Sequence, residues 1–361
     1  MICSLSCDEA YRYLGILESN DFHYSSMKSI LSSEYKHHLH RVLSSHLAGK
    51  YCIQAINTFA VSLLRYSAGL ISWTKNELYQ LDVKTRKLLS LYHAFSVNGD
   101  VDRLYVLRKQ GGRGLLSIAD VITKEMTSLQ LYVNSSSEPL LQLVSTQQGW
   151  RLNDSSVCVT DPSEVHMELW KGKALHGQFC HQLLPYVDHR WQWSWLKSAN
   201  LLKETEGFLM AAQEQALTTN IMKSQIFHLP VSSLCRLCHS ADESIDHLIS
   251  SCTFLVQSHY KKRHDVVASY IHWKLSNNAG FDVVKNWWQH HPDSVLENDV
   301  CRILWDYTIF TGSSLAHNRP DITYMIKGEN KTMFIEVAVP GDSCISHKMV
   351  EKRKDMLICA S

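Results

Sequence analysis

Cys235-Arg236-Leu237-Cys238 is followed by His247 and Cys252, which gives the spacing C-x2-C-x8-H-x4-C. Two cysteines separated by two residues can bind one ion through a tight turn, and a histidine and a cysteine one helical turn apart complete a tetrahedron. Because the protein supplies all four ligands, the spacing predicts a structural zinc knuckle over residues 231–265. His259 and His264 are near enough in the sequence to be alternative ligands, and the other alternative is four unrelated residues in a cysteine-rich chain.

The composition is that of a folded protein. The 361 residues are 45% hydrophobic and 20% charged, which fits two or three globular domains and excludes a disordered tail. The longest apolar stretch, around residues 55–64, is interrupted by Asn57, Thr58 and Ser62, so it is too short and too polar to span a membrane. Eleven cysteines are an odd number and no secretory signal is visible, so we expect an intracellular protein, nuclear or cytoplasmic, with reduced thiols.

A second signal for chemistry follows the cysteine–histidine segment. Arg319-Pro320-Asp321 precedes two stretches, 322–327 and 332–339, that are predicted strands joined by Gly328-Glu329-Asn330-Lys331, a hairpin signal. Asp321 opens the first predicted strand and Glu336 lies inside the second, so the hairpin brings the two carboxylates together. Restriction-type nucleases use two such carboxylates to bind Mg²⁺ beside a scissile phosphate.

Such a nuclease also needs a lysine that orients or deprotonates the attacking water. The lysine most often lies two residues after the second acid, where this chain has Ala338. Lys348 or Lys352, on a predicted following helix, would have to substitute for it. We therefore predict that the catalytic residues are Asp321 and Glu336 with Lys348 or Lys352. The alternative is a turn aspartate and an exposed strand glutamate without a shared role.

The chain upstream of the zinc knuckle is predicted to be helical. Apolar residues recur every three or four positions between residues 27 and 125, with Gly49 as a predicted helix end and Thr74 as a predicted N-cap. The run Ser135-Ser136-Ser137-Glu138-Pro139 predicts a linker. A second helical block follows over about residues 164–223. The fold class expected is α+β, mostly helical with a small α/β part at the end.

One segment of the helical part is basic, although the formal net charge of the chain is only +1. Residues 84–113 contain seven lysines or arginines against two acids. Glycines beside arginines would let the backbone approach a phosphate that the guanidinium groups clamp, and a solvated turn is the alternative. We predict phosphate contacts from Lys84, Arg86, Lys87, Arg103, Arg108, Lys109 and Arg113.

Together these motifs resemble one family. Residues Tyr11-Arg12-Tyr13-Leu14-Gly15-Ile16 resemble the segment after the catalytic core of the reverse transcriptases of non-LTR retrotransposons, and residues 55–68 resemble the helical thumb. Asp100-Val101-Asp102-Arg103-Leu104-Tyr105 and Gly111-Gly112-Arg113-Gly114-Leu115 resemble the stretch that follows the thumb. The order of thumb, Cys/Cys/His/Cys knuckle, Arg-Pro-Asp and Glu-Val-Ala-Val-Pro is that of elements that integrate with a restriction-like endonuclease.

The resemblance implies a C-terminal fragment of a retrotransposon polyprotein whose parent is an RNA-directed DNA polymerase and endonuclease. It divides the chain into a thumb with its basic segment (1–134), a helical linker region (135–230), the zinc knuckle (231–265) and a restriction-like endonuclease domain (266–361). It implies structural zinc and, for the nuclease, Mg²⁺. The implied partners are DNA and RNA, as primer–template or target duplex, with no membrane and no small-molecule substrate.

Two departures from the family restrict the activity that we expect. The polymerase's paired aspartates, usually in a Phe/Tyr-Ala-Asp-Asp turn, should lie upstream of Tyr11, and the sequence has no such turn, so we expect no polymerase activity. After Glu351-Lys352 the family carries a Lys-Tyr pair that Arg353-Lys354-Asp355-Met356 does not match, so we expect an incomplete nuclease with residual Mg²⁺-dependent nicking at most. The alternatives are a non-enzymatic zinc-containing nucleic-acid-binding protein, an inactive gene relic or a zinc-stabilised adaptor between proteins.

Overall fold

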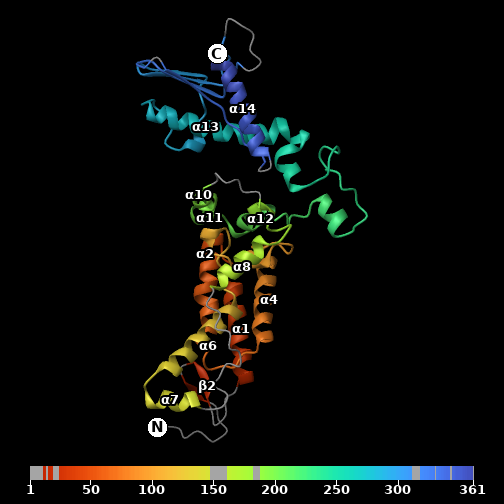
Figure 1. Cartoon of the computed structure of the whole chain (residues 1–361), viewed down its shortest axis with the longest axis vertical. Helices are drawn as coiled ribbons and strands as arrows, with labels where there is room; N and C mark the ends of the chain where they lie inside the picture. The colour runs from red at the N-terminus through yellow and green to blue at the C-terminus, as the bar shows by residue number, and fades with distance from the viewer. Residues whose placement is uncertain are drawn as a thin grey trace. The chain divides into compact units, whose positions relative to one another are not determined.

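A computed structural model of the chain describes residues 11–13, 15–18, 24–146, 161–181, 188–310, 318–329, 331–341 and 344–360. The chain forms two compact units, Met1–Leu217 and Thr218–Ser361. The first is helical apart from a short hairpin, and the second contains the cysteine–histidine segment and a four-stranded antiparallel sheet (Figure 1). The predicted fold class, mostly helical with a small sheet near the C-terminus, is confirmed. Among the described residues, no helix is long and apolar enough to cross a membrane.

The first unit begins with the hairpin of β1 (Tyr11–Tyr13) and β2 (Ile16–Glu18), followed by the long helix α1 (Tyr24–Leu43). The apolar residues of α1 recur every four positions, so they form one buried stripe along the helix. The next helical run contacts α1 and has three parts without a break: α2 (Gly49–Ala55), the π-helix η1 (Ile56–Val61) and α3 (Ser62–Tyr66). The stripe on α1 consists of Met27, Leu31, Tyr35, Leu39 and Leu43.

Helices α4 (Lys75–Leu91) and α6 (Ile118–Ser135) complete this core. The predicted N-cap is confirmed, because Thr74 forms a capping box with Glu77 at the start of α4. The buried carboxylate of Asp82, on α4, accepts hydrogen bonds from the first amides of α6, those of Ile118 at 2.9 Å and Ala119 at 3.2 Å. Asp82 of α4 thus accepts hydrogen bonds from backbone N–H groups that have no partner within α6. This contact holds α4 and α6 against each other.

Shorter helices make up the rest of the first unit. The predicted linker consists only of residues 136–138, which separate α6 from α7. The second helical block, predicted over about residues 164–223, contains α12. These helices are α5 (Val101–Tyr105), η2 (Arg108–Gln110), α7 (Pro139–Thr146), α8 (Pro162–Lys171), α9 (Gln178–His181), α10 (His189–Gln192), α11 (Ser194–Ser198) and α12 (Lys203–Gln213).

The second unit opens with short helical turns around the cysteine–histidine segment and then forms the long helix α13 (Lys261–Asn278). The turn η6 (Val256–Tyr260) leads into α13 without a break. The other turns are η3 (Met222–Ile226), η4 (His247–Ser251), η5 (Thr253–Leu255) and η7 (Trp287–Gln289).

The sheet of this unit has the order β3-β4-β5-β6, so each strand pairs with its neighbour in the sequence. Helix α13 runs beside this sheet (Figure 1), and its residues Ile271 and Leu275 pack against a buried core formed by strand residues. The predicted hairpin of β5 and β6 is confirmed, but Glu336 lies just after β6 rather than inside it. The bounds are β3 (Val295–Glu297), β4 (Cys301–Trp305), β5 (Ile322–Ile326), β6 (Lys331–Ile335) and the last helix α14 (Ile345–Ala360).

A buried carboxylate, that of Glu206 on α12, connects distant parts of the first unit. One of its oxygens lies 2.5 Å from Arg108 Nη2, and the other lies 3.0 Å from Arg113 Nη2. Glu206 is 2% exposed and Arg113 is equally buried, so water does not screen this pair. The residue predicted to end a helix, Gly49, instead begins α2, where a Cβ atom would lie only 2.8 Å from the Glu206 carboxylate.

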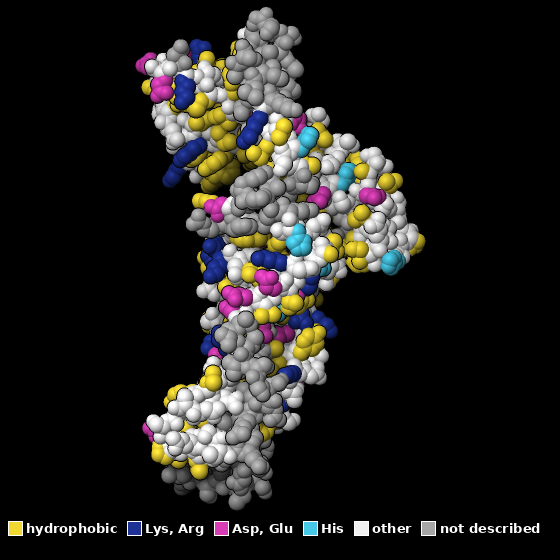
Figure 2. Space-filling model, viewed as in Figure 1, with side chains coloured by type: hydrophobic (Ala, Val, Ile, Leu, Met, Phe, Trp, Pro, Cys, Tyr) yellow, Lys and Arg dark blue, Asp and Glu magenta, His cyan; other side chains and the backbone are white. Residues whose placement is uncertain are grey.

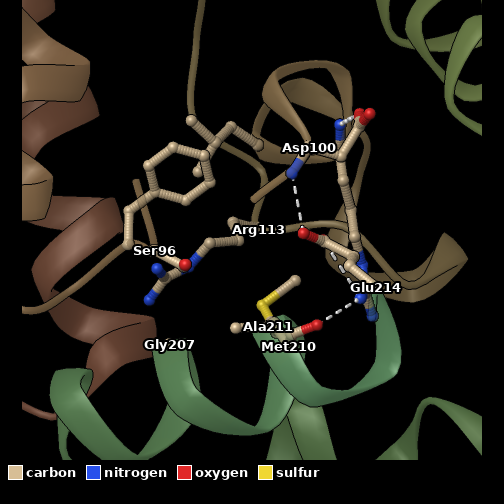
Figure 3. Close-up of a pocket in the computed structure, with 10 residues that line it drawn as sticks. Ser96, Asp100, Arg113, Gly207, Met210, Ala211 and Glu214 are labelled. Atoms are coloured by element: carbon tan, nitrogen blue, oxygen red, sulfur yellow. Dashed lines mark hydrogen bonds and ion pairs between the residues drawn. The ribbon is translucent and has the colours of Figure 1, made fainter. Parts of the chain in front are cut away.

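A second buried pair joins Arg103, on α5, to Glu214, just after α12. Arg103 Nη1 lies 3.2 Å from Glu214 Oε1, while the guanidinium carbon lies 4.7 Å from the ring centroid of Trp170. The other carboxylate oxygen of Glu214 accepts the amide of Asp100 at 2.7 Å (Figure 3). The cavity left beside these residues measures about 10 Å³, which is room for roughly one water molecule. It is a packing defect and not a ligand site.

We expect Glu206→Gln to destabilise the first unit by about 3–5 kcal/mol, because it removes the partner of two guanidinium groups that stay in the core. The matched control is Glu204→Gln, since Glu204 is on the same helix but 45% exposed beside Lys203. That change should cost less than about 1 kcal/mol. Urea unfolding followed by far-UV circular dichroism measures both values. Equal effects of the two variants would contradict a structural role for the buried pair.

The same pair predicts a direction for the pH dependence. Burial alone would raise the pKa of Glu206, but Arg113 and Arg108 outweigh it and lower the pKa below its ordinary value. The stabilisation is therefore complete above the unfolded pKa of about 4.3 and is lost as the pH falls through the lower, folded value.

Candidate metal centre

The four residues of the predicted zinc site lie together. All their ligand atoms are within 4.8 Å of one another, with 3.9 Å between the sulfurs of Cys235 and Cys252 and 3.3 Å between Cys238 Sγ and His247 Nε2. Zinc bonds of about 2.3 Å to sulfur and about 2.0 Å to nitrogen, at tetrahedral angles, separate two sulfurs by roughly 3.8 Å and a sulfur from a nitrogen by roughly 3.5 Å. The Cys3His cluster is therefore compatible with one structural zinc ion.

The first two ligands are positioned by a tight turn. The amide of Cys235 donates to Ala241 O at 2.8 Å, and the amide of His239 donates back to Cys235 O at 2.9 Å. His239 has a φ of 54°, a left-handed conformation that turns the chain back toward the cluster. Leu234 and Asp242 close the base of the turn with a β-bridge. Both cysteine side chains consequently face one side of the turn.

A buried acid, Glu243, stabilises this turn. Its carboxylate accepts the Arg236 amide at 2.9 Å, the Arg236 Nε at 2.8 Å and the amide of Asn220 at 3.0 Å. The hydrogen bond from the Arg236 side chain is the largest cause that lowers the pKa of Glu243 to about 2. Glu243 therefore stays charged at neutral pH and connects the turn to the segment before it.

The other two ligands share one supporting residue, Tyr260. Its hydroxyl oxygen accepts the amide of Cys252 at 3.0 Å and lies 3.1 Å from His247 O and 2.9 Å from Leu248 O, to which its hydrogen can be donated. Outer residues of this kind orient metal ligands and affect metal affinity. Sequence spacing did not indicate Tyr260, because its role depends on how η6 folds back over the cluster.

The protonation of the thiols fits a metal ligand set. Hydrogen bonds from the hydroxyl and amide of Ser240 lower the pKa of Cys238 to about 6, whereas burial raises the pKa of Cys252. Zinc binds thiolates, so a thiol whose pKa is raised must release its proton when the metal binds. The two histidines considered as alternatives lie elsewhere: His259 is exposed beside Ser258, and His264 contacts Asp321.

The predicted nuclease acids lie near each other but have different partners. β5 and β6 pair Ile322 with Ile335, so Asp321 and Glu336 are opposite one another just beyond the paired residues. Asp321 Oδ2 accepts the amide of Val337 at 2.7 Å, and the two acids line different cavities of about 400 and 520 Å³.

The two predicted lysines lie on α14 and differ in their contacts. Lys352 forms an ion pair with Glu336, whereas Lys348 lies 2.7 Å from Glu351 on its own helix. His264 contacts Asp321, with 3.3 Å between His264 Nε2 and Asp321 Oδ2, and was not among the predicted catalytic residues. Nothing in the sequence pattern placed it beside Asp321, because the two residues are brought together only by the packing of α13 on the sheet.

The predicted phosphate-binding residues separate into two groups. Arg103 and Arg113 are buried in the ion pairs described above, and Arg108 is mostly buried against Glu206. These three are structural residues, which corrects their assignment to a phosphate-binding surface. Arg86 donates to the hydroxyl of Tyr105 at 2.9 Å. The exposed members of the predicted set are Lys84, Lys87 and Lys109.

Acidic and basic side chains are interspersed on the face of the first unit that Figure 2 shows, over its described residues. This agrees with the near-zero net charge of the chain. No protein-family model matches the chain, and no curated protein matches its sequence.

We expect purified protein to contain about one zinc ion per chain, and Cys235→Ser to contain none. Such a site can supply roughly 10 kcal/mol or more of folding free energy to a small module, so residues 231–265 should lose their fold with the metal. Elemental analysis and limited proteolysis measure the two effects.

Two variants serve as controls. Cys344→Ser changes an exposed cysteine in the same unit and should retain the zinc. His247→Cys should also retain it, because four thiolates form a tetrahedral site as well. A metal-free protein whose segment 231–265 resists proteolysis would contradict the assignment.

Proposed function

We propose that the chain is a zinc-stabilised, nucleic-acid-binding fragment of a non-LTR retrotransposon polyprotein. The observation that carries the proposal is the Cys3His cluster, together with its position in the chain. Within the same unit the cluster is followed by paired strands flanked by Asp321 and Glu336, with Lys352 against Glu336. This order of a knuckle, then an acid–hairpin–acid arrangement with a lysine, supports the resemblance stated from the sequence.

Exposed lysines supply a surface for phosphates in each unit. Lys84 and Lys87 are three residues apart on α4, so their side chains extend from neighbouring points of one helical face. In the second unit, Lys261 and Lys262 are exposed in the first turn of α13, directly after the residues that support the zinc cluster. A structural zinc site in such a unit orders the backbone, and the lysines supply the phosphate contacts.

We expect the full chain to bind duplex DNA with little sequence preference and with an affinity that falls steeply as salt rises. Each phosphate contact contributes about 0.9 to the slope of log affinity against log salt, so Lys84→Ala with Lys87→Ala should lower the slope by about 2. The matched control, Lys124→Ala with Lys285→Ala, removes the same charge from exposed lysines elsewhere. Fluorescence anisotropy at several salt concentrations measures the slopes. An equal change in both double variants would mean that α4 is not the contact surface.

DNA nicking is a second candidate function, favoured by the ion pair between Lys352 and Glu336. The catalytic lysine of such nucleases most often occupies the position that is Ala338 in this chain. Lys352, beside Glu336, would take its place. We expect slow nicking of supercoiled plasmid with Mg²⁺ or Mn²⁺, lost in Asp321→Ala and in Lys352→Ala. Lys348→Ala should retain most of the activity, because Lys348 pairs with Glu351 instead. Nicking that survives Asp321→Ala would come from a contaminant and would exclude this function.

A further inference from the structure

Both ring nitrogens of His166, on α8, lie at hydrogen-bond distance from a carboxylate of the first unit. Nδ1 lies 2.7 Å from Asp102 Oδ1, on α5, and Nε2 lies 3.1 Å from Asp120 Oδ2, on α6. An ionised carboxylate only accepts hydrogen bonds, so each ring nitrogen must carry a proton for both bonds to form. The charged imidazolium has two N–H donors, whereas neutral imidazole has one. The geometry therefore fits a protonated His166.

His166 lies in the middle of the face of α8 that packs on the rest of the unit. On this face Ser163 Oγ accepts the amide of Leu107 at 3.1 Å. The Trp170 ring is fully buried, with the guanidinium carbon of Arg103 4.7 Å from its centroid. Ser163, His166 and Trp170 are three and four positions apart, so they share one side of the helix. His166 thus contributes a contact whose strength changes with protonation near neutral pH.

The charges around His166 favour its protonated form. Lys173, just after α8, lies 2.6 Å from a carboxylate oxygen of both Asp100 and Asp102. Loss of the proton from His166 would leave three carboxylates beside one ammonium group. The titratable groups that face His166 or its partners are Asp100, Asp102, Tyr105, Asp120 and Lys173, with Arg86 on the Tyr105 hydroxyl.

The direction of the pH dependence follows from these contacts. Burial by itself would lower the pKa of His166, but the hydrogen bonds to Asp120 and Asp102 outweigh burial and raise the pKa above its ordinary value. The stabilisation is therefore complete below the unfolded pKa of about 6.5 and is lost as the pH rises through the higher, folded value.

The two carboxylates are not equivalent when His166 becomes neutral. The Asp102 side chain is 17% exposed and keeps Lys173, whereas the Asp120 side chain is 36% exposed and can turn toward water. A single proton on Nδ1 retains the shorter bond, to Asp102. The lone pair of Nε2 then faces an oxygen of Asp120 that also only accepts. The contact that opens is therefore the one between α8 and α6.

We propose that His166 is a pH-sensitive latch between α8 and α6. The imidazolium joins α8 to Asp120, and the neutral imidazole releases that contact while Asp102 and the buried Trp170 continue to hold α8 on the unit. The latch acts within the first unit and needs neither nucleic acid nor metal, so it is independent of the proposed function.

The latch is tested by two measurements on the full, zinc-loaded chain between about pH 5 and about pH 9. The imidazole signal of His166 in NMR spectra, assigned by its absence in His166→Gln, should titrate with a midpoint above about 6.5. Amide hydrogen exchange, corrected for its intrinsic rate, measures the protection of α8. This protection should fall as the pH rises, by about 10-fold for each pH unit by which the midpoint exceeds the ordinary value, because opening of α8 frees His166. The protection of α1 is the internal reference.

Conservative variants separate the latch from general packing. Asp120→Asn supplies an amide N–H that can be donated to neutral Nε2, so the protection of α8 should no longer fall with pH. The matched control, His37→Gln, changes an exposed histidine on α1 and should keep the pH dependence. Unchanged protection of α1 shows that each variant is folded. A midpoint at or below about 6.5, protection of α8 that does not depend on pH in the unsubstituted chain, or a pH dependence that persists in Asp120→Asn would each overturn the latch.

Discussion

The buried carboxylate of Glu206 is the constraint on which the first unit depends. It lies between the guanidinium groups of Arg108 and Arg113, so it holds α12 against the segment that carries both arginines. The close contact also requires glycine at two points. A Cβ atom on Gly49 would lie 2.8 Å from the carboxylate, and one on Gly207 would lie 2.7 Å from Ala94 O. The start of α2 and the middle of α12 are therefore both shaped by this one ion-pair cluster.

The same constraint explains why a basic segment does not make a basic surface. A buried arginine without a partner costs several kcal/mol, so the fold supplies each one with an acid: Arg113 has Glu206, and Arg103 has Glu214. Glycine and arginine side by side, which also suit phosphate binding, here serve close packing: a Cβ atom on Gly112 would clash with Val106 O, and one on Gly111 would clash with the ring of Trp193. Charge in this part of the chain serves packing, and under the proposed function contact with nucleic acid would be made by exposed lysines such as Lys84.

In the second unit one continuous helical run connects the Cys3His cluster to the hairpin of β5 and β6. Tyr260, at the end of η6, supports two ligands of the Cys3His cluster, and His264, in the first turn of α13, contacts Asp321. The two residues are four positions apart, so they lie on the same side of the run. The helical run therefore places Tyr260 against the Cys3His cluster and His264 against Asp321 beside β5.

The sequence by itself determined the features that depend on local spacing: the Cys3His cluster, the N-cap at Thr74, the hairpin of β5 and β6, and the mostly helical class. Ligand spacing, caps and alternating strands are set by residues a few positions apart, so they can be read from a single chain. The residues that contact Arg113, Asp321 and Gly49 could not be predicted from the sequence, because each of them lies about 60 to 160 positions away along the chain. Only tertiary packing decided which charges are buried, since burial selects partners by proximity in space and not by order in the chain.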